Sequence, residues 1–315
     1  MVNNVLIAGA GQLGSRYLQG LSCYASPIKI WVFDIAPSAI ERAQQRWEEC
    51  GGSAHSVVYI SDIADIPDKL DFVFVTSNSD VRQDIVRKIV QVSSVRFWIL
   101  EKVLARRVSE LYNLLNLTSE SAGVWVNTPM YLWPLYKNIH DYYPLGTLLH
   151  ARFSNINGLA CNAIHYIDFV SRWNQGRIVS LDTSGLNNKW VSSKRSGFFE
   201  VEGEIVVGFS DGSTLLLSGS NKPEAYSVEF EIDGDIWKVD EVNGVAKNNT
   251  GSVIAGTILL QSELIAPLLG NIVSSGCCGL PTLELSVTQH EPLLNALLAH
   301  WNANMEEQLD YVPIT

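Results

Sequence analysis

The sequence has few cysteines, and their spacing does not suit a metal centre. Its 315 residues include 5 cysteines, an odd number, and no pair has CxxC spacing. A disulfide framework and a cysteine-bound metal are therefore not expected, and no metal ligands are predicted. Free thiols persist in reducing compartments, so the cysteine usage favours the cytoplasm.

Basic residues and long apolar runs are also scarce. There are 22 Lys and Arg against 33 Asp and Glu, which gives a net charge of -11. An acidic surface repels a phosphate backbone, so we expect no nucleic-acid partner. No apolar run approaches the roughly 20 residues of a membrane-spanning helix, and the first residues lack the pattern of a signal peptide. We therefore expect no membrane partner either.

The chain contains two regions with different strand patterns. In residues 1–123 short apolar strands alternate with helical patterns, which predicts a Rossmann domain with a doubly wound parallel sheet. In residues 124–315 strand-like runs follow one another, with turn signals such as Asp233-Gly234 between them. This predicts an α+β domain for substrate binding and oligomerisation, with a mostly antiparallel, open sheet and helices on one face.

The predicted elements can be given by residue range. The first region has strands at 5–8, 28–33, 56–60, 72–75 and 97–100, and helices at 13–21, from 37 onward, at 81–92 and at 108–117. The second has strands at 145–153, 199–209, 214–219, 226–232 and 236–239, and helices near 162–173, 257–270 and 289–302.

A glycine motif follows the first predicted strand. Gly9, Gly11 and Gly14 have GxGxxG spacing. In a dinucleotide-binding turn the first glycine permits the tight turn, the second lets the pyrophosphate approach, and the third lets helix and strand pack closely. The phosphates bind the amide groups at the helix start, which here include Gln12 and Leu13. The motif therefore predicts a dinucleotide site.

Asp34 indicates which dinucleotide is bound. It ends the second strand 34 − 14 = 20 residues after Gly14, where a carboxylate accepts hydrogen bonds from the adenosine ribose. A carboxylate repels a 2′-phosphate, and no arginine adjoins it, so NAD is favoured over NADP. The alternative is that Asp34 only caps the helix that follows.

Two further strand ends make the motif more specific. Thr76-Ser77-Asn78 follows one predicted strand, and Glu101-Lys102 follows the next. With the glycine motif, this pattern resembles the Gfo/Idh/MocA family of oxidoreductases, which includes glucose-fructose oxidoreductase and inositol dehydrogenase. The resemblance implies that Thr76, Ser77, Asn78 and Glu101 contact the nicotinamide half of the cofactor, and that Lys102 lies beside the reacting carbon. Val103 stands where the family usually has proline.

The second region adds candidate substrate residues. Residues 158–168 resemble the family's helix that carries a catalytic histidine, which corresponds to His165. Cys161 takes the place of the family's acid, while Asn162 shares a helix face with His165 and is predicted to bind substrate. Lys194 and Arg195, in a predicted loop, are candidates for holding a substrate phosphate or carboxylate. Residues 158–168, 194–198 and 280–284 also resemble a branch linked to surface-polysaccharide biosynthesis.

The resemblance implies an NAD-dependent oxidoreductase acting on a hydroxyl or carbonyl carbon of a sugar, nucleotide sugar or cyclic polyol. Lys102 and His165 would handle the alcohol proton, which does not leave unaided. Family members pair through the C-terminal sheet, so a homodimer or homotetramer is expected. Two alternatives stay open: a dehydrogenase for an amino- or imino-containing ligand, and a non-catalytic NAD-binding sensor or scaffold in a biosynthetic complex.

Overall fold

The structure is a computed structural model that describes residues 4–51, 54–220 and 225–315, and the chain forms two compact units. Unit 1 comprises Met1–Ala105, Ser109–Asn127 and Leu259–Glu284, and unit 2 comprises Arg106–Val108, Thr128–Ile258 and Leu285–Thr315. The sequence placed the division at 123/124, close to the Asn127/Thr128 division in the structure. The structure differs in assigning Leu259–Glu284 to unit 1.

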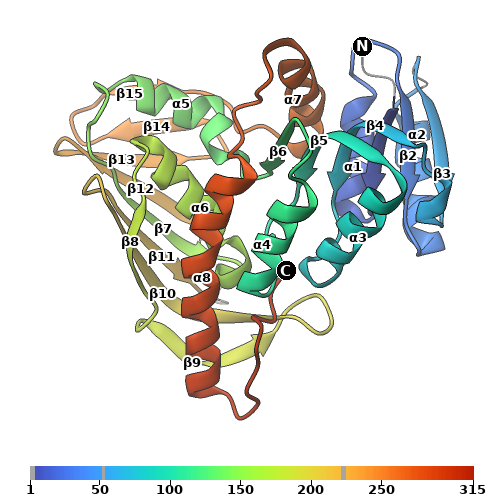
Figure 1. Ribbon diagram of the computed structural model, residues 1–315. Coiled ribbons are helices and arrows are strands. Elements are labelled where there is room, and N and C mark those ends of the chain that lie inside the picture. Colours follow the sequence, from blue (N-terminus) through green and yellow to red (C-terminus); the bar gives the residue numbers. More distant parts are fainter. Residues whose placement is uncertain (1–3, 52–53, 221–224) are drawn as a thin grey trace. The chain divides into compact units, whose positions relative to one another are not determined.

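Unit 1 is built on a six-stranded parallel sheet with the strand order β3-β2-β1-β4-β5-β6 (Figure 1). Strand β1 is apolar and buried after Asn4, and β4 is apolar and buried from Phe72 onward, as expected for central strands covered on both faces. The strand order reverses between these two strands, and this switch point is where such folds bind dinucleotides. The predicted Rossmann fold is confirmed.

The elements of unit 1 match most of the predicted ranges. The strands are β1 (Asn4–Ala8), β2 (Lys29–Phe33), β3 (Ser56–Ile60), β4 (Lys69–Val75), β5 (Ser94–Leu100) and β6 (Gly123–Val126). The helices are α1 (Gln12–Leu21), α2 (Pro37–Glu49), the short η1 (Ile63–Asp65), α3 (Ser79–Val92), α4 (Val108–Leu117) and α7 (Gln261–Ser275).

Helix α7 explains why a late segment belongs to unit 1. It packs against α1, which also contacts α2. Gly20 of α1 allows the close approach, because a Cβ there would lie 2.4 Å from the Ser262 carbonyl oxygen. The helix was predicted near 257–270 as part of the second region. Its position along the chain concealed this packing partner.

Unit 2 is built on a nine-stranded mixed sheet, ordered β15-β14-β13-β12-β7-β11-β10-β8, with β9 paired to β10. The β7–β11 pair is parallel and the other pairs are antiparallel. Its strands are β7 (His150–Ile156), β8 (Ile178–Asp182), β9 (Leu186–Ser192), β10 (Phe199–Phe209), β11 (Thr214–Gly219), β12 (Ser227–Ile232), β13 (Asp235–Asp240), β14 (Val245–Asn248) and β15 (Val253–Ala255). Its helices are η2 (Pro129–Leu132), α5 (Pro134–Asp141), α6 (Leu159–Trp173) and α8 (Leu283–Asn304).

The two faces of this sheet differ. Helix α6 packs on β7, β10 and β11, and α5 packs on β14 and β15 (Figure 1). An aromatic core fills the covered face, where the Phe169 and Phe230 rings stack with their centroids 5.6 Å apart. The opposite face carries exposed charged residues such as Arg152 and Lys238. The predicted open sheet with helices on one face is therefore confirmed.

Some predicted boundaries were wrong. The strand expected at 145–153 begins only at His150, because Thr147 closes a turn onto the Pro144 carbonyl oxygen and Gly146 has a φ of +89°. Strands β6, β8, β9, β14 and β15 and helix α5 were missed. Strand β15 has only three residues, and polar residues interrupt the apolar pattern of β9, so neither gives a clear strand signal.

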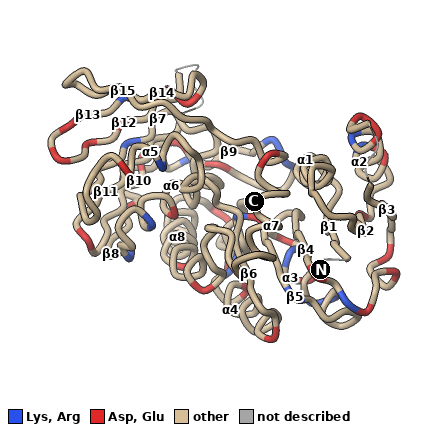
Figure 2. The backbone as a smooth tube through the Cα atoms, turned by 90° about the horizontal axis from the view of Figure 1, so that it is seen from above, with Lys and Arg blue, Asp and Glu red and all other residues tan. Residues whose placement is uncertain are grey.

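Acidic residues lie on turns and helices of both units (Figure 2). Among the residues that the structure describes, no helix combines the length and apolar character needed to cross a bilayer.

Candidate functional site

The glycine turn of unit 1 has the geometry of a phosphate-binding loop. Gly9 has a φ of +110° and donates its amide to the Phe33 carbonyl oxygen at 2.8 Å. A Cβ on Gly14 would lie 1.8 Å from the Gly9 carbonyl oxygen, so only glycine fits there. A Cβ on Gly11 would meet nothing within 4 Å, so this position borders open space at the start of α1.

The start of α1 suits an anion. Its N-cap is Gly11, and no side chain caps the helix. The first amides of such a helix have no partners within the helix and carry its positive end. Arg46 donates to both the side chain and the carbonyl oxygen of Gln12, at 2.6 and 2.9 Å. The amides of Gln12 and Leu13 are thus the groups suited to a phosphate, whereas the Gln12 side chain is engaged by α2.

Asp34 lies beside the glycine turn and braces it. One carboxylate oxygen accepts the Ala10 amide at 2.7 Å, and the other accepts the Ala36 amide at 2.9 Å. Each oxygen has a second lone pair, so these bonds leave capacity for a ribose hydroxyl. The structure therefore supports a role in loop geometry, and ribose binding stays a prediction.

Three loops at the carboxyl edge of the sheet are tied together. The Thr76 hydroxyl donates to the Gly9 carbonyl oxygen at 2.6 Å, which joins the loop after β4 to the glycine turn. Arg82 of α3 donates to the carbonyl oxygens of Ser77 and Val103, which joins the loops after β4 and β5. Asn78 is the N-cap residue of α3 and is half-buried.

Arg82 was not among the predicted site residues, although the sequence pattern around it contained a signal. It stands four residues before Val86 and seven before Ile89, both of which are fully buried. That spacing places all three on one face of the helix. A charged residue on an otherwise apolar face points to a buried polar contact.

Glu101 lies in a buried network of polar side chains. Its carboxylate is buried and accepts hydrogen bonds from the Tyr17 hydroxyl and, at 2.7 Å, from Asn127 Nδ2. Asn127 Nδ2 also lies 2.9 Å from Gln261 Oε1. Burial raises the pKa of Glu101, and its hydrogen bonds and the charge of Arg82 oppose that shift. This side chain thus anchors the strand end from within unit 1, and its contact with the cofactor stays a prediction.

Lys102, the proposed neighbour of the reacting carbon, directly follows Glu101 and is half-buried. The Lys102–Val103 peptide bond is cis.

In unit 2 the candidate residues gather at the start of α6. Gly158 begins this helix with a φ of +74°. The Glu200 carboxylate, from β10, accepts the amides of Ala160 and Cys161 at 2.9 and 3.4 Å. The Asn162 side-chain amide donates to the Asn157 carbonyl oxygen at 2.9 Å. Glu200 was missed because it lies about 40 residues away in the sequence and meets α6 only through folding.

His165 lies one turn further along α6 and is half-buried. It thus shares a helix with Asn162, as predicted. Lys194 and Arg195 are exposed in the hairpin between β9 and β10, which the Ser193 amide closes by donating to the Phe198 carbonyl oxygen at 2.9 Å. Their role in binding substrate stays a prediction.

Asp168 anchors the same helix. It is fully buried and accepts hydrogen bonds from the Thr128 hydroxyl at 2.9 Å and from Gln289 Nε2 at 3.2 Å. Arg172 is 3.8 Å away. Burial raises the pKa of Asp168 to about 6, although these partners oppose the shift.

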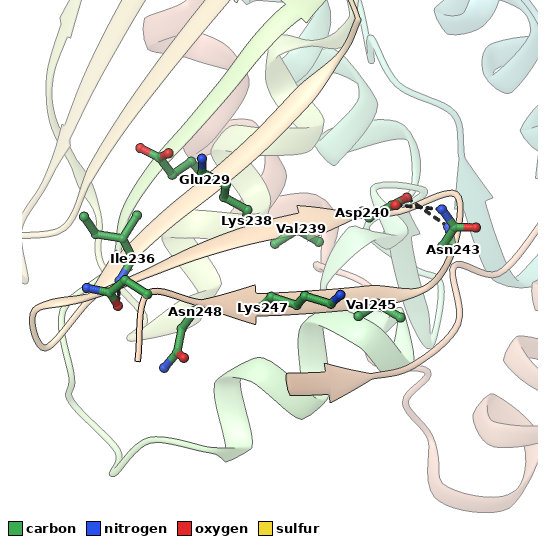
Figure 3. A pocket seen from close by; sticks show the side chains of 10 residues that line it. Glu229, Ile236, Lys238, Val239, Asp240, Asn243, Val245, Lys247 and Asn248 are labelled. Atoms are coloured by element: carbon green, nitrogen blue, oxygen red, sulfur yellow. Dashed lines mark hydrogen bonds between the residues drawn. The ribbon is translucent and has the colours of Figure 1, made fainter. Parts of the chain in front are cut away.

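A pocket of about 960 Å³ opens on the uncovered face of unit 2 (Figure 3). It is lined by residues of β12 to β14 such as Glu229, Lys238 and Lys247, and by none of the predicted site residues. Asn243 Nδ2 donates to the Asp240 carboxylate at its rim, at 2.7 Å. In the parts of the chain that the structure describes, no three His, Cys, Asp or Glu residues are grouped so that they could hold a metal ion.

Comparisons with known proteins show the fold. No protein-family model matches the sequence, and no curated protein matches it either. Solved structures do match. UDP-N-acetylglucosamine 3-dehydrogenase GnnA from Acidithiobacillus ferrooxidans superposes with a TM-score of 0.70 at 11% identity, covering 94% of this chain and 97% of that one. Scyllo-inositol dehydrogenase from Lactobacillus casei, solved with NAD(H) and scyllo-inositol, has a TM-score of 0.69 at 17% identity, covering 96% and 98%.

A third match is an oxidoreductase from Agrobacterium radiobacter, solved with NAD+, L-tartaric acid and magnesium. Its TM-score is 0.70 at 14% identity, and the match covers 96% of this chain and 97% of that one. The chain has the fold of these oxidoreductases. Both regions are covered in all three matches, so the two-part architecture implied by the Gfo/Idh/MocA resemblance is confirmed.

Proposed function

We propose that this protein is an NAD-dependent oxidoreductase that transfers a hydride between nicotinamide and a hydroxyl or carbonyl carbon of a sugar, nucleotide sugar or cyclic polyol. One observation carries the proposal: the glycine turn and the loops after β4 and β5 are bonded together at the sheet's carboxyl edge. That edge is where doubly wound folds bind dinucleotides. The NAD(H)-bound inositol dehydrogenase and the nucleotide-sugar dehydrogenase of the same fold support this chemistry.

The chain offers a fitting group for each part of the cofactor. The uncapped start of α1 and the open space at Gly11 fit the pyrophosphate. Asp34 would accept the ribose hydroxyls and disfavour a 2′-phosphate, so NAD is proposed over NADP. Thr76, Ser77 and Asn78 would border the nicotinamide half. NAD, when bound, supplies or accepts the hydride.

Lys102 and His165 are the proposed catalytic residues. An alcohol oxygen must lose its proton as the hydride leaves carbon, and the reverse direction must return it. Lys102 would hydrogen-bond the substrate oxygen and stabilise its developing charge. His165 would receive or return the proton, while Asn162, Lys194 and Arg195 would bind other polar groups of the substrate.

The test uses Lys102→Met and His165→Ala. Both variants should keep the NAD affinity of the wild type, measured by calorimetry, and lose roughly 100-fold or more in turnover. The assay is nicotinamide absorbance across a panel of inositols, sugars and nucleotide sugars. Full turnover in either variant would remove that residue from the mechanism. Tight NAD binding with no turnover on any panel member would instead favour the non-catalytic sensor or scaffold.

Cofactor binding is tested separately at the glycine turn. Gly11→Ala adds a methyl group where the protein has no neighbour within 4 Å, so the variant should fold normally. We expect it to weaken NAD binding, because the methyl group would occupy the approach of the pyrophosphate. An unchanged NAD affinity would place the pyrophosphate elsewhere.

We also propose that the uncovered face of the unit 2 sheet joins two or more copies in a homodimer or homotetramer. A cross-strand row on this face runs Arg152, Glu229, Lys238 and Lys247, so both signs of charge are present. A two-fold axis brings one such face against its own copy and lets opposite charges meet. Sedimentation at the mass of a single 34.8 kDa chain would refute this. All five cysteines lie in the part of the chain that the structure describes, and none forms a disulfide, which supports the proposed cytoplasmic location.

A further inference from the structure

We propose that Arg82 is a positioning residue for the nicotinamide half of the cofactor site. Its guanidinium fixes the loop after β4 relative to the loop after β5, and thereby sets the position of Lys102. The inference rests on the proposed function, since it assigns a role within that cofactor site.

The burial of Arg82 is unusual for a charged side chain. It lies on α3, is 1% exposed, and shares its helix face with Val86 and Ile89. Burying a guanidinium costs free energy unless its donors are engaged. An apolar residue would suit this face of α3 better if packing were the only requirement. The contacts that Arg82 makes must therefore account for the charge.

Those contacts reach the two loops that flank the predicted nicotinamide site. One terminal nitrogen donates to the Ser77 carbonyl oxygen and the other to the Val103 carbonyl oxygen. Ser77 follows Thr76, which is itself bonded to the Gly9 carbonyl oxygen at 2.6 Å, and Val103 follows Lys102. A guanidinium is a rigid planar fork, so two bonds from it fix the separation of their acceptors. A lysine ammonium lacks this geometry.

The charge of Arg82 also acts on the buried carboxylate beside Lys102. Burial raises the pKa of Glu101, and the positive charge of Arg82 is among the effects that lower it. Arg82 therefore stabilises the anionic form of the residue that anchors the end of β5. Both effects act on the segment that presents Lys102.

If Arg82 only stabilised the fold, its loss would weaken the binding of NAD and ADP-ribose alike. If it positions the nicotinamide site, its loss should weaken NAD binding more. ADP-ribose carries the adenosine and pyrophosphate of NAD but no nicotinamide. With Arg82→Met, we expect ADP-ribose affinity within about twofold of wild type and a loss of about tenfold in the preference for NAD over ADP-ribose. Both affinities are measured by calorimetry, which requires no substrate. A parallel loss of both affinities would overturn the inference.

A conservative variant covers the case in which Arg82→Met does not fold. Arg82→Lys keeps the charge but not the fork, so it should fold and lose part of the NAD preference. Full preference in this variant would overturn the inference. Arg87→Met is the matched control: Arg87 lies on the same helix, is exposed, and pairs with Asp84. It should leave both affinities unchanged.

The same affinity measurements distinguish failure of the proposed function from failure of the role proposed for Arg82. If the wild-type protein bound neither NAD nor ADP-ribose, the cofactor proposal itself would be refuted, and this inference with it. If the wild type bound both ligands and Arg82→Met kept the full NAD preference, only the positioning role would be refuted.

Discussion

Unit 1 and unit 2 each bury one carboxylate next to a residue proposed to act on the substrate. Among the residues that the structure describes, Glu101 and Asp168 are the two buried carboxylates. Glu101 directly precedes Lys102, and Asp168 follows His165 by three residues on α6. Both accept hydrogen bonds from one hydroxyl and one side-chain amide. In both units, a buried carboxyl group thus holds the segment that presents the candidate residue.

The two carboxylates differ in how their charge is compensated. The buried Arg82 acts electrostatically on Glu101, and the Tyr17 hydroxyl and Asn127 amide bond it directly. Asp168 also accepts hydrogen bonds from neutral donors, but the charge of Arg172, 3.8 Å away, is the largest effect that opposes the rise in its pKa. Attraction between charges in a low-dielectric interior depends strongly on such placement. Unit 1 thus relies mainly on neutral donors to stabilise its buried carboxylate, with a smaller effect from Arg82, while unit 2 relies more on the charge of a neighbouring arginine.

The largest expected effect comes from removing the carboxylate of unit 1. Glu101→Ala would leave the Tyr17 hydroxyl, the Asn127 amide and the charge of Arg82 uncompensated in the interior. Breaking such a buried charged network costs about 3–5 kcal/mol of unfolding free energy. Urea unfolding followed by circular dichroism measures it. Glu101→Gln keeps an acceptor of the same shape and removes the charge, so it should cost less, and an unchanged unfolding free energy in Glu101→Gln would refute a role for the charge.

The next effect is a pH dependence that belongs to unit 2. Burial raises the pKa of Asp168 to about 6, so the folded state binds this proton more tightly than the unfolded state. Its contribution to stability is therefore fully present below the unfolded pKa near 4 and is lost as pH rises through about 6. The expected loss across that window is about 3 kcal/mol. Unfolding free energies measured at several pH values test it.

Substitutions of Asp168 and of a control carboxylate, Asp182, show whether Asp168 causes this pH dependence. The difference in unfolding free energy between wild type and Asp168→Asn should change across that pH window, because asparagine does not titrate. Asp182, which is exposed in the same unit, has its pKa lowered by the backbone and hydroxyl of Ser184. Its contribution is lost as pH falls, so Asp182→Asn should show the opposite sign. Parallel curves for wild type and Asp168→Asn would contradict the assignment.

The sequence predicted most of the strands and helices of both units, but not the hydrogen-bond partners of the two buried carboxylates. Strand ends at Thr76 and Lys102 were visible because polar residues stand directly after buried apolar strands. The partners of Glu101 were not visible, because Tyr17 is 84 residues away and Asn127 is 26 residues away. Gln261, which contacts Asn127, is 134 residues from it. No local periodicity links such positions. Only the packing of α1, β6 and α7 around β5 brings them together.

Removing a single hydrogen-bond donor should cost less unfolding free energy. One such donor in each unit allows the two buried carboxylates to be compared directly. Tyr17→Phe removes one hydroxyl donor from Glu101, and Thr128→Val removes one from Asp168, without changing the side-chain shape much. A hydrogen bond to a charged group contributes about 1.5–3 kcal/mol, and one to a neutral group about 1 kcal/mol. Because a carboxyl with a pKa of about 6 is mostly ionised at neutral pH, Thr128→Val should cost about 1.5–3 kcal/mol there, and this cost should fall toward about 1 kcal/mol as Asp168 is protonated below pH 6. Denaturant unfolding at neutral and acidic pH measures both costs.

The smallest effect is expected at a carboxylate that is not buried. Glu200 is half-exposed and accepts two amides at the positive start of α6. Glu200→Gln keeps an oxygen acceptor for these amides and removes only the charge, whose interaction with a helix terminus contributes about 0.3–1 kcal/mol. Because water and ions screen an exposed charge, this cost should shrink in high salt, whereas the cost of Glu101→Ala should not. A salt-independent loss of more than about 2 kcal/mol for Glu200→Gln would instead place Glu200 with the buried anchors.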